Sequence, residues 1–350
     1  MQLAGLTGTG FLHEETAFYA QDKLLSSTDE VMDEWVDQAG ARMAQQGLVG
    51  VVDLTMGHNL DAWHRRVQKG WRHTRVEVGT YALQLDEVLA AGYRTGEAID
   101  PLGLTTMGPL KIISDGTLTA RTAYCHLPYV KSGIGDPIQG HEHGQRVTDQ
   151  FYLLMLMQQA LDHGLECAVH AIGDRANTEV LDAFAQIGVK GSIEHAQLLQ
   201  PTDVERMAQL GLRASVQPGH LLDDRDSIDL LWGPERAGRA FPWADMARNG
   251  VDIRLGSDAP IAPIDPWGAI ETAVRRTHAA REPWHPEQSL TLSQALMAST
   301  HGVTELVPGG AADLVALPGN PFEYETDLLH TMSPLLTMTA GRLTWDGGLS

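Results

Sequence analysis

The chain has 350 residues, of which 43% are hydrophobic, so it is long enough to bury a sizeable core. Its 45 acidic side chains outnumber its 25 basic ones and give a formal charge of −20, which argues against a surface for nucleic acid or anionic membranes. The 36 glycines occur without a long Gly/Ser tract, which is typical of a turn-rich globular fold rather than of disorder.

Cysteine usage and the N-terminal residues indicate a protein of the reducing cytoplasm. Neither Cys125 nor Cys167 lies in a CxxC or mixed Cys/His spacing, so we expect no disulfide framework and no structural zinc module. The N-terminal residues lack the basic and apolar segments of a leader, and the apolar run 151–157 is far shorter than the ~20 residues of a membrane span. We therefore expect no export or anchoring signal.

Residues 45–260 alternate short apolar runs with helical patterns, as a parallel sheet with crossover helices requires. One helix is expected between Asp149 and Gly164, another over 202–211, and a third from a capping box of Thr291 and Gln294 to near Gly302. Seven strands are expected, at 51–53, 76–81, 110–114, 167–170, 192–195, 214–217 and 253–257.

The pattern changes after Gly302, where two strands follow with no helix between them. They are expected at 313–317 and 336–345, the second interrupted by Ala340 and Gly341. We therefore predict a catalytic domain over 1–302 and a small β appendage over 303–350.

Most predicted strands end in a residue that can bind metal or move protons. In a barrel of parallel strands the carboxyl ends converge on one face, where such enzymes place their active sites. These residues are Asp53, Lys111 with Asp115, His170, His195, Gln217 with His220, and Asp258.

His170, His195 and Asp258 are the strongest candidates for a metal site. Alone, each histidine fits a core residue bonded to a carbonyl, and Asp258 fits a helix cap. Together, two imidazoles and a carboxylate at successive strand ends suit Zn²⁺ or a similar divalent ion. Asp258 could instead accept the proton of a metal-bound water. We expect Asp174 to cap the helix that follows it.

Lys111 lies within an apolar strand and has two interpretations, which the sequence leaves open. Its ammonium group could extend to solvent, as isolated lysines commonly do. Burial would instead lower its pKa, and the neutral amine could react with carbon dioxide to give a carbamate that bridges two metal ions.

Five motifs together resemble the metal-dependent amidohydrolase superfamily, and within it the branch called amidohydrolase family 3, which includes N-substituted formamide deformylases. The motifs are KIISDG from Lys111, HAIGD from His170, IEHAQ around His195, QP at Gln217 and LGSDAP around Asp258. The resemblance implies a TIM-type (β/α)₈ barrel with a small β-sandwich, one or two divalent ions, and hydrolysis of non-peptide amide or related C–N bonds.

The resemblance also implies roles for individual residues. Lys111 matches the fourth-strand position that is often a carboxylated ligand, His170 and His195 match the fifth- and sixth-strand ligands, and Asp258 matches the eighth-strand acid.

Three further residues match positions near the substrate. Gln217 and His220 fall where the seventh strand of the family approaches it. Glu15 lies in a segment similar to a Gly-x-x-x-Glu stretch of the family, and a solvated surface carboxylate is the equally fitting alternative.

The family's His-x-His at the end of the first barrel strand has no counterpart in a suitable context. The pair His141 and His143 lies between glycines in a turn-rich segment, so we interpret it as a loop that only mimics the motif. We therefore expect a barrel without its first strand and only part of the sandwich. Three interpretations follow: a longer natural protein, a partial single-metal site of Lys111, His170 and His195, or a remnant without catalysis.

The leading functional prediction is a hydrolase in which metal-activated water attacks an amide, formamide or cyclic amide and Asp258 moves the proton to the leaving nitrogen. The alternative is a non-catalytic barrel that keeps a ligand or partner surface. An oxidoreductase is disfavoured because GLTGTG at residues 5–10 does not match the Gly-x-Gly-x-x-Gly fingerprint. We expect a small-molecule substrate, zinc as the metal, and a homo-oligomer as a further option.

Overall fold

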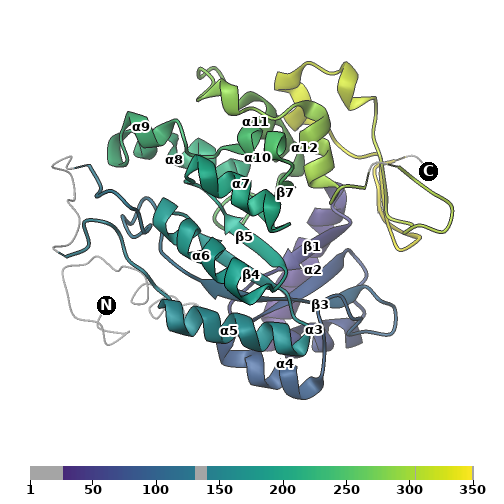
Figure 1. Cartoon of the computed structure of the whole chain (residues 1–350). Coiled ribbons are helices and arrows are strands. Elements are labelled where there is room, and N and C mark those ends of the chain that lie inside the picture. Colours follow the sequence, from purple (N-terminus) through teal and green to yellow (C-terminus); the bar gives the residue numbers. More distant parts are fainter. Residues whose placement is uncertain (1–26, 131–139, 304, 349–350) are drawn as a thin grey trace.

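A seven-stranded parallel sheet forms the centre of the computed structural model, which describes residues 27–130, 140–303 and 305–348. Its strands pair in chain order, and the sheet curls into part of a barrel with helices outside it (Figure 1). All seven predicted strands are confirmed, although the third begins five residues before its predicted start. They are β1 (Gly50–Asp53), β2 (Arg75–Tyr81), β3 (Thr105–Ile113), β4 (Cys167–Ala171), β5 (Gly191–His195), β6 (Arg213–Val216) and β7 (Asp252–Leu255).

Helices connect successive strands, as parallel pairing requires. In Figure 1, α3 to α5 lie in the lower part of the view and α7 to α12 in the upper part, around the outside of the curled sheet. The bounds are α2 (Asp29–Gln45), α3 (Asn59–Gln68), α4 (Leu85–Ala91), α5 (Gln150–His163), α6 (Asp174–Ile187), α7 (Pro201–Gln209), α8 (Pro218–Leu231), α9 (Pro234–Ala237), α10 (Trp243–Asn249), α11 (Pro266–Arg275) and α12 (Leu292–Ser299).

Three of the predicted helix boundaries are set by the capping residues that the sequence shows. The Asp149 side chain accepts a hydrogen bond from the backbone of Tyr152 at the start of α5, and Gly164 ends the helix with φ of 75°. Thr291 and Gln294 form the predicted capping box of α12. That helix ends at Ser299, somewhat before the expected Gly302.

The expectation that Asp174 caps α6 is wrong. Gly173 holds the N-cap position, and no side chain caps this helix. The Asp174 carboxylate is used elsewhere, because it accepts hydrogen bonds from the His126 backbone at 3.0 Å and from Gln200 Nε2 at 2.8 Å. Long-range contacts therefore take the place of the local cap.

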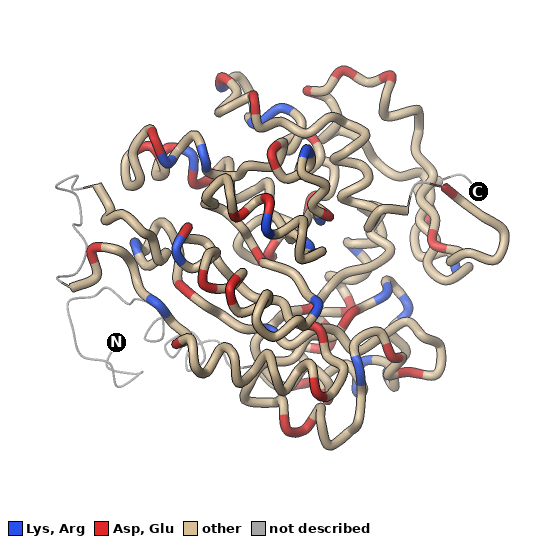
Figure 2. The backbone as a smooth tube through the Cα atoms, viewed as in Figure 1, with Lys and Arg blue, Asp and Glu red and all other residues tan. Residues whose placement is uncertain are grey.

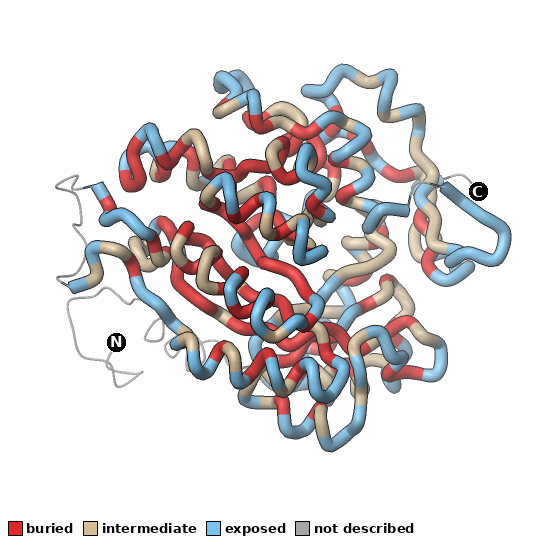
Figure 3. Tube along the Cα trace, viewed as in Figure 1, coloured by how far each residue is buried: buried red, intermediate tan, exposed pale blue. Residues whose placement is uncertain are grey.

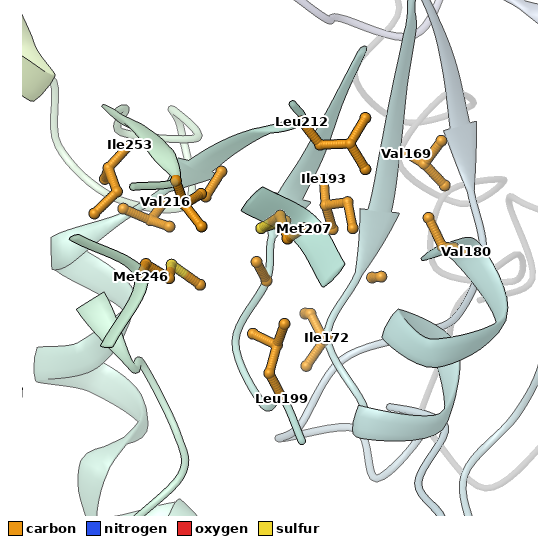
Figure 4. Packing of buried hydrophobic residues seen from close by; sticks show 14 of the residues in the cluster. Val169, Ile172, Val180, Ile193, Leu199, Met207, Leu212, Val216, Met246 and Ile253 are labelled. Carbon is orange, nitrogen blue, oxygen red and sulfur yellow. The ribbon is translucent and has the colours of Figure 1, made fainter. Parts of the chain in front are cut away.

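The core is deepest at the central strands. Every residue of β5 and all but one of β4 are buried, whereas β1 has no buried residue and β7 has one. Figure 3 shows this concentration of buried positions, and Figure 4 shows the apolar side chains that pack between the strands and their helices. Among the described residues no pairing joins β1 to β7, so the sheet keeps two free edges.

A second, antiparallel sheet confirms the predicted strands of the C-terminal appendage. It contains β8 (Leu314–Ala316), β9 (Leu336–Thr339) and β10 (Arg342–Asp346), and Ala340 and Gly341 turn the chain between the last two with positive φ. The sheet packs against α2, and Arg75 Nε donates to Asp313 Oδ2 at 2.7 Å. The domain boundary at residue 302 stays a prediction.

Three further features concern the cysteines, the distribution of charge and the character of the helices. Both cysteines are free and buried. Acidic positions are spread along the whole trace rather than gathered on one face (Figure 2). None of the helices in the described part of the chain combines the length and apolar character needed to cross a membrane.

Candidate metal centre

His170 lies near the end of β4, and a carboxylate next to it is held firmly in place. Asp115, which is fully buried just beyond β3, accepts hydrogen bonds from the backbones of Ile172, Gly173 and Tyr124. Its Oδ1 lies 3.3 Å from His170 Nε2, and the carbonyl of Gly116 lies 3.2 Å from the same nitrogen.

The surroundings of His170 determine which of its nitrogens is available to a ligand. Because a carbonyl oxygen can only accept, Nε2 carries the proton when it bonds to Gly116. The lone pair is then on Nδ1. A carboxylate in this position is the outer partner that orients a metal-binding imidazole in many proteins.

His195 ends β5 in a left-handed backbone conformation, with φ of 72°, and Ala196 follows with φ of 43°. Such conformations are uncommon for residues other than glycine and cluster at functional sites. The His195 ring meets the His170 ring with centroids 4.6 Å apart and planes at 72°. The change in backbone direction therefore places both strand-end imidazoles on the same face of the sheet.

Gln217, the residue after β6, fixes the tautomer of His195. Its Nε2 donates to the carbonyl of Ser215 at 3.2 Å, so its Oε1 faces His195 Nδ1 at 2.8 Å and accepts a proton from it. His195 Nε2 is then left with the lone pair. Burial, and the nearby His170, Lys111 and His220, hold the pKa of His195 well below its ordinary value, which keeps the ring neutral and able to bind metal.

Lys111 is buried on β3, and its side chain is therefore not extended to solvent. Burial lowers the pKa of its amine, against the opposing charges of Glu194 and Asp258. Tyr81, at the end of β2, is the register partner of Lys111. The pKa of Tyr81 is raised by burial and by Asp258, Asp53 and Glu194, so this phenol borders the same group of charges.

His220 and Asp258 approach His195 from the β6 and β7 side. His220 lies in the first turn of α8, and its ring stacks on that of His195 with centroids 5.5 Å apart. Its Nε2 lies 3.6 Å from Asp258 Oδ2. Asp258 follows β7 with φ of 55° and does not cap a helix, because Asp265 caps α11.

The fold thus brings His170, His195, Gln217, His220 and Asp258 together at the carboxyl ends of the strands. Asp53 and His143 have hydrogen-bond partners outside this group. Glu15 lies outside the described residues. The Asp53 carboxylate accepts from Thr55 and from Trp63 Nε1, which gives it a structural partner set. The pair at 141 and 143 lies in a turn, where His143 bonds to the Cys125 carbonyl.

Tyr81 and Glu194 are site residues that the sequence analysis missed. Glu194 is buried on β5, and its Oε1 accepts from Ser192 Oγ at 2.5 Å. The two-residue spacing of Ser192 and Glu194 was the available signal, since it places both on one face of a strand. Tyr81 was visible only as an ordinary strand aromatic.

The curled parallel sheet and the imidazole and carboxylate groups at its strand ends are those of a TIM-type metallo-hydrolase barrel. The match to known proteins specifies the family. The model of the amidohydrolase family matches residues 4–345, so the chain belongs to the amidohydrolase family. This family and its solved neighbours imply a divalent metal ion.

Curated relatives agree with this assignment. The chain is 33% identical over 260 residues to Protein LONG AFTER FAR-RED 3 of Arabidopsis thaliana, covering 67% of this chain and 42% of the relative. It is 31% identical to the putative amidohydrolase YtcJ of Bacillus subtilis, with 68% and 47% covered. It is 28% identical to the N-substituted formamide deformylase of Arthrobacter pascens, with 52% and 37% covered. The chain therefore spans about half the length of these relatives or less.

Solved structures show the same fold. An uncharacterized metal-dependent hydrolase from Pyrococcus furiosus matches with a TM-score of 0.73 and 26% identity, covering 86% of this chain and 63% of that one. The Aspergillus niger ochratoxinase, at 16% identity and a TM-score of 0.62, shares the fold over 94% of this chain and 79% of that one.

The residues present fit a divalent ion. His170 and His195 each have one nitrogen held by a protein acceptor and the other left with its lone pair. The Nε2 atom of His220 is buried and has no hydrogen-bond partner in the structure. Imidazole nitrogens with a free lone pair beside a carboxylate are donors that divalent ions such as zinc accept.

Proposed function

We propose that this chain forms the metal-binding part of a hydrolase that cleaves non-peptide C–N bonds, in an amide, a formamide or a cyclic amide. The observation that carries the proposal is the pair of strand-end imidazoles, 4.6 Å apart and each oriented by an outer acceptor, with Lys111 and Asp258 nearby. Similarity to an N-substituted formamide deformylase favours this bond class. A small organic substrate fits it.

The four predicted ligands have distinct roles in this proposal. His170, His195, Asp258 and Lys111 would hold one or two divalent ions, with zinc favoured by the imidazole and carboxylate donors. When bound, such an ion activates water and polarises a carbonyl oxygen. The Asp258 side chain is 45% exposed, so it can reach substrate and move a proton to the leaving nitrogen.

Lys111 would enter the site as a carbamate. Burial lowers the pKa of its amine and so favours the neutral form, whose nitrogen forms a bond to the carbon of carbon dioxide and releases one proton. The product carries an oxygen ligand where the ammonium would have stood. Carbon-13 NMR with labelled carbon dioxide tests this step, and the expected carbamate signal disappears in Lys111→Ala.

Formate release from an N-substituted formamide tests the bond class. We expect turnover that a chelator abolishes, that zinc restores, and that Asp258→Asn lowers by at least ~100-fold. Cyclic and simple amides form the comparison panel. Zinc binding without turnover of any of these compounds would contradict hydrolysis and favour a barrel that only binds ligands or partners.

A further inference from the structure

We propose that His220 is a metal ligand and that it forms, with His195 and Asp258, a cation site at the β6 and β7 side of the sheet. This inference rests on the metal-dependent function proposed above. It changes the role of His220, which the family resemblance places beside the substrate, and it adds this imidazole to the ligands proposed above.

The three side chains are already close to the spacing that one ion requires. One ligand atom from each lies within 4.8 Å of the other two. His220 Nε2 and Asp258 Oδ2 are 3.6 Å apart. Two atoms bound at ~2.1 Å to one tetrahedral zinc ion lie ~3.4 Å apart. This separation is longer than a good hydrogen bond and fits two ligands of a shared ion.

The nitrogens that would bind are the ones that the protein leaves unused. Gln217 occupies His195 Nδ1, so the lone pair of that ring is on Nε2. His220 Nε2 is a buried atom that has no hydrogen-bond partner. A buried polar atom without a partner costs free energy, and a bound cation would remove that cost.

The donor set also has an open position. Two imidazoles and one carboxylate are the three protein ligands of many catalytic zinc sites, where water or substrate takes the fourth place. The described residues contain one other group with metal-like spacing, His58, Asp61 and Glu87. The side chains of His58 and Glu87 are 64% and 56% exposed, and water satisfies such groups without an ion.

Zinc titration of the full chain tests the proposal. We expect one tight site, measured by competition with a chromophoric chelator, and a loss of at least ~100-fold in affinity in His220→Gln, more than the 10–100-fold of an outer partner. His163→Gln, an exposed histidine at the end of α5, is the matched control and retains the affinity. His58→Gln also retains it, which excludes the exposed group.

The ligand variants separate this inference from the proposed function. Loss of affinity in His220→Gln supports the site described above, whether or not His170→Ala and Lys111→Ala also lose affinity. Unchanged affinity in His220→Gln, with loss in His170→Ala, overturns the inference and leaves the proposed metal centre standing. If the wild type binds no zinc, the inference is overturned. Formate release is measured separately and tests the proposed function on its own.

A cysteine substitution gives a spectroscopic readout of direct ligation at position 220. His220→Cys loaded with Co²⁺ is expected to show thiolate-to-cobalt charge-transfer absorption, because sulfur would replace nitrogen as a ligand. The wild type should lack this band, since Cys125 and Cys167 are buried and their thiol pKa values are raised by burial. His163→Cys controls for surface thiolate binding, and a band of equal strength there would refute the assignment.

Discussion

The centre and the two edges of the parallel sheet are built from different interactions. β4 and β5 are buried on nearly every residue and carry His170 and His195 at or near their carboxyl ends. The rings of these histidines are held by backbone and side-chain acceptors. β1 and β7 together have a single buried residue and lack a partner on one side within the described residues. The imidazole part of the site therefore rests on a packed core, whereas the Asp258 part lies next to a free edge.

Loss of the His195 imidazole, which belongs to both proposed ligand sets, should have the largest effect on zinc affinity. His195→Ala removes the ring that contacts both His170 and His220, so we expect zinc affinity to fall by more than ~100-fold. Equilibrium dialysis followed by elemental analysis measures this. Affinity equal to that of the wild type would show that the packed centre does not hold the ion.

Truncating a side chain should lower the free energy of unfolding more at the centre of the sheet than at its edge. Ile193→Ala on β5 removes a fully buried side chain and should lower the free energy of unfolding by about 2–5 kcal/mol. Val52→Ala on β1 removes a side chain that is 42% exposed and should change it by about 0.5 kcal/mol at most. Urea unfolding measures both values. Equal losses would contradict the contrast between the strands.

The stability of the region beside β1 should depend on charge, because the buried carboxylate of Asp33 links α2 to basic side chains of α3 and its C-cap. Its carboxylate bonds to Arg65, Arg66 and Lys69 at 2.7 to 3.1 Å. Burial alone would raise the Asp33 pKa, but these hydrogen bonds outweigh it and hold the pKa below its ordinary value. Asp33→Asn should therefore cost on the order of 2 kcal/mol at neutral pH.

The sign of the pH dependence follows from the lowered pKa of Asp33. The stabilisation is present above the unfolded-state pKa of 3.8 and is lost as the pH falls through the lower folded-state value. The difference in unfolding free energy between the wild type and Asp33→Asn should shrink below about pH 4. A difference that stays constant down to the acid transition would refute this role.

The smallest expected effect is at the β7 edge, where α12 packs. Thr291→Ala removes the hydrogen bond to the Gln294 backbone and should cost about 1 kcal/mol of unfolding free energy. Thr291→Ser keeps a capping hydroxyl and should cost less than half of that. Guanidinium unfolding of the two variants distinguishes them, and equal losses would indicate a packing effect instead.

Local signals predicted the strands, the helix ends and the strand-end position of the site. Apolar runs and the capping box of Thr291 act over a few residues, so the sequence shows them directly. Asp174 was predicted wrongly because its partners, His126 and Gln200, are distant in the chain. The same reason hid the link between Arg75 and Asp313, which are separated by 238 residues.

Within the site, the residue types were predictable and their mutual geometry was not. The left-handed conformation of His195 and its bond to Gln217 depend on how β5 and β6 pack, which no motif encodes. The proximity of His220 to Asp258 arises because α8 and the segment after β7 begin at the same end of the sheet.

Anomalous X-ray scattering at the zinc edge, on crystals of the zinc-loaded chain, locates the bound ion directly. We expect a peak at the carboxyl ends of the strands, about 2.0–2.2 Å from His195 Nε2 and from its partner ligands. A peak confined to His58, Asp61 and Glu87, or crystals without a peak at His195, would contradict the proposed metal centre.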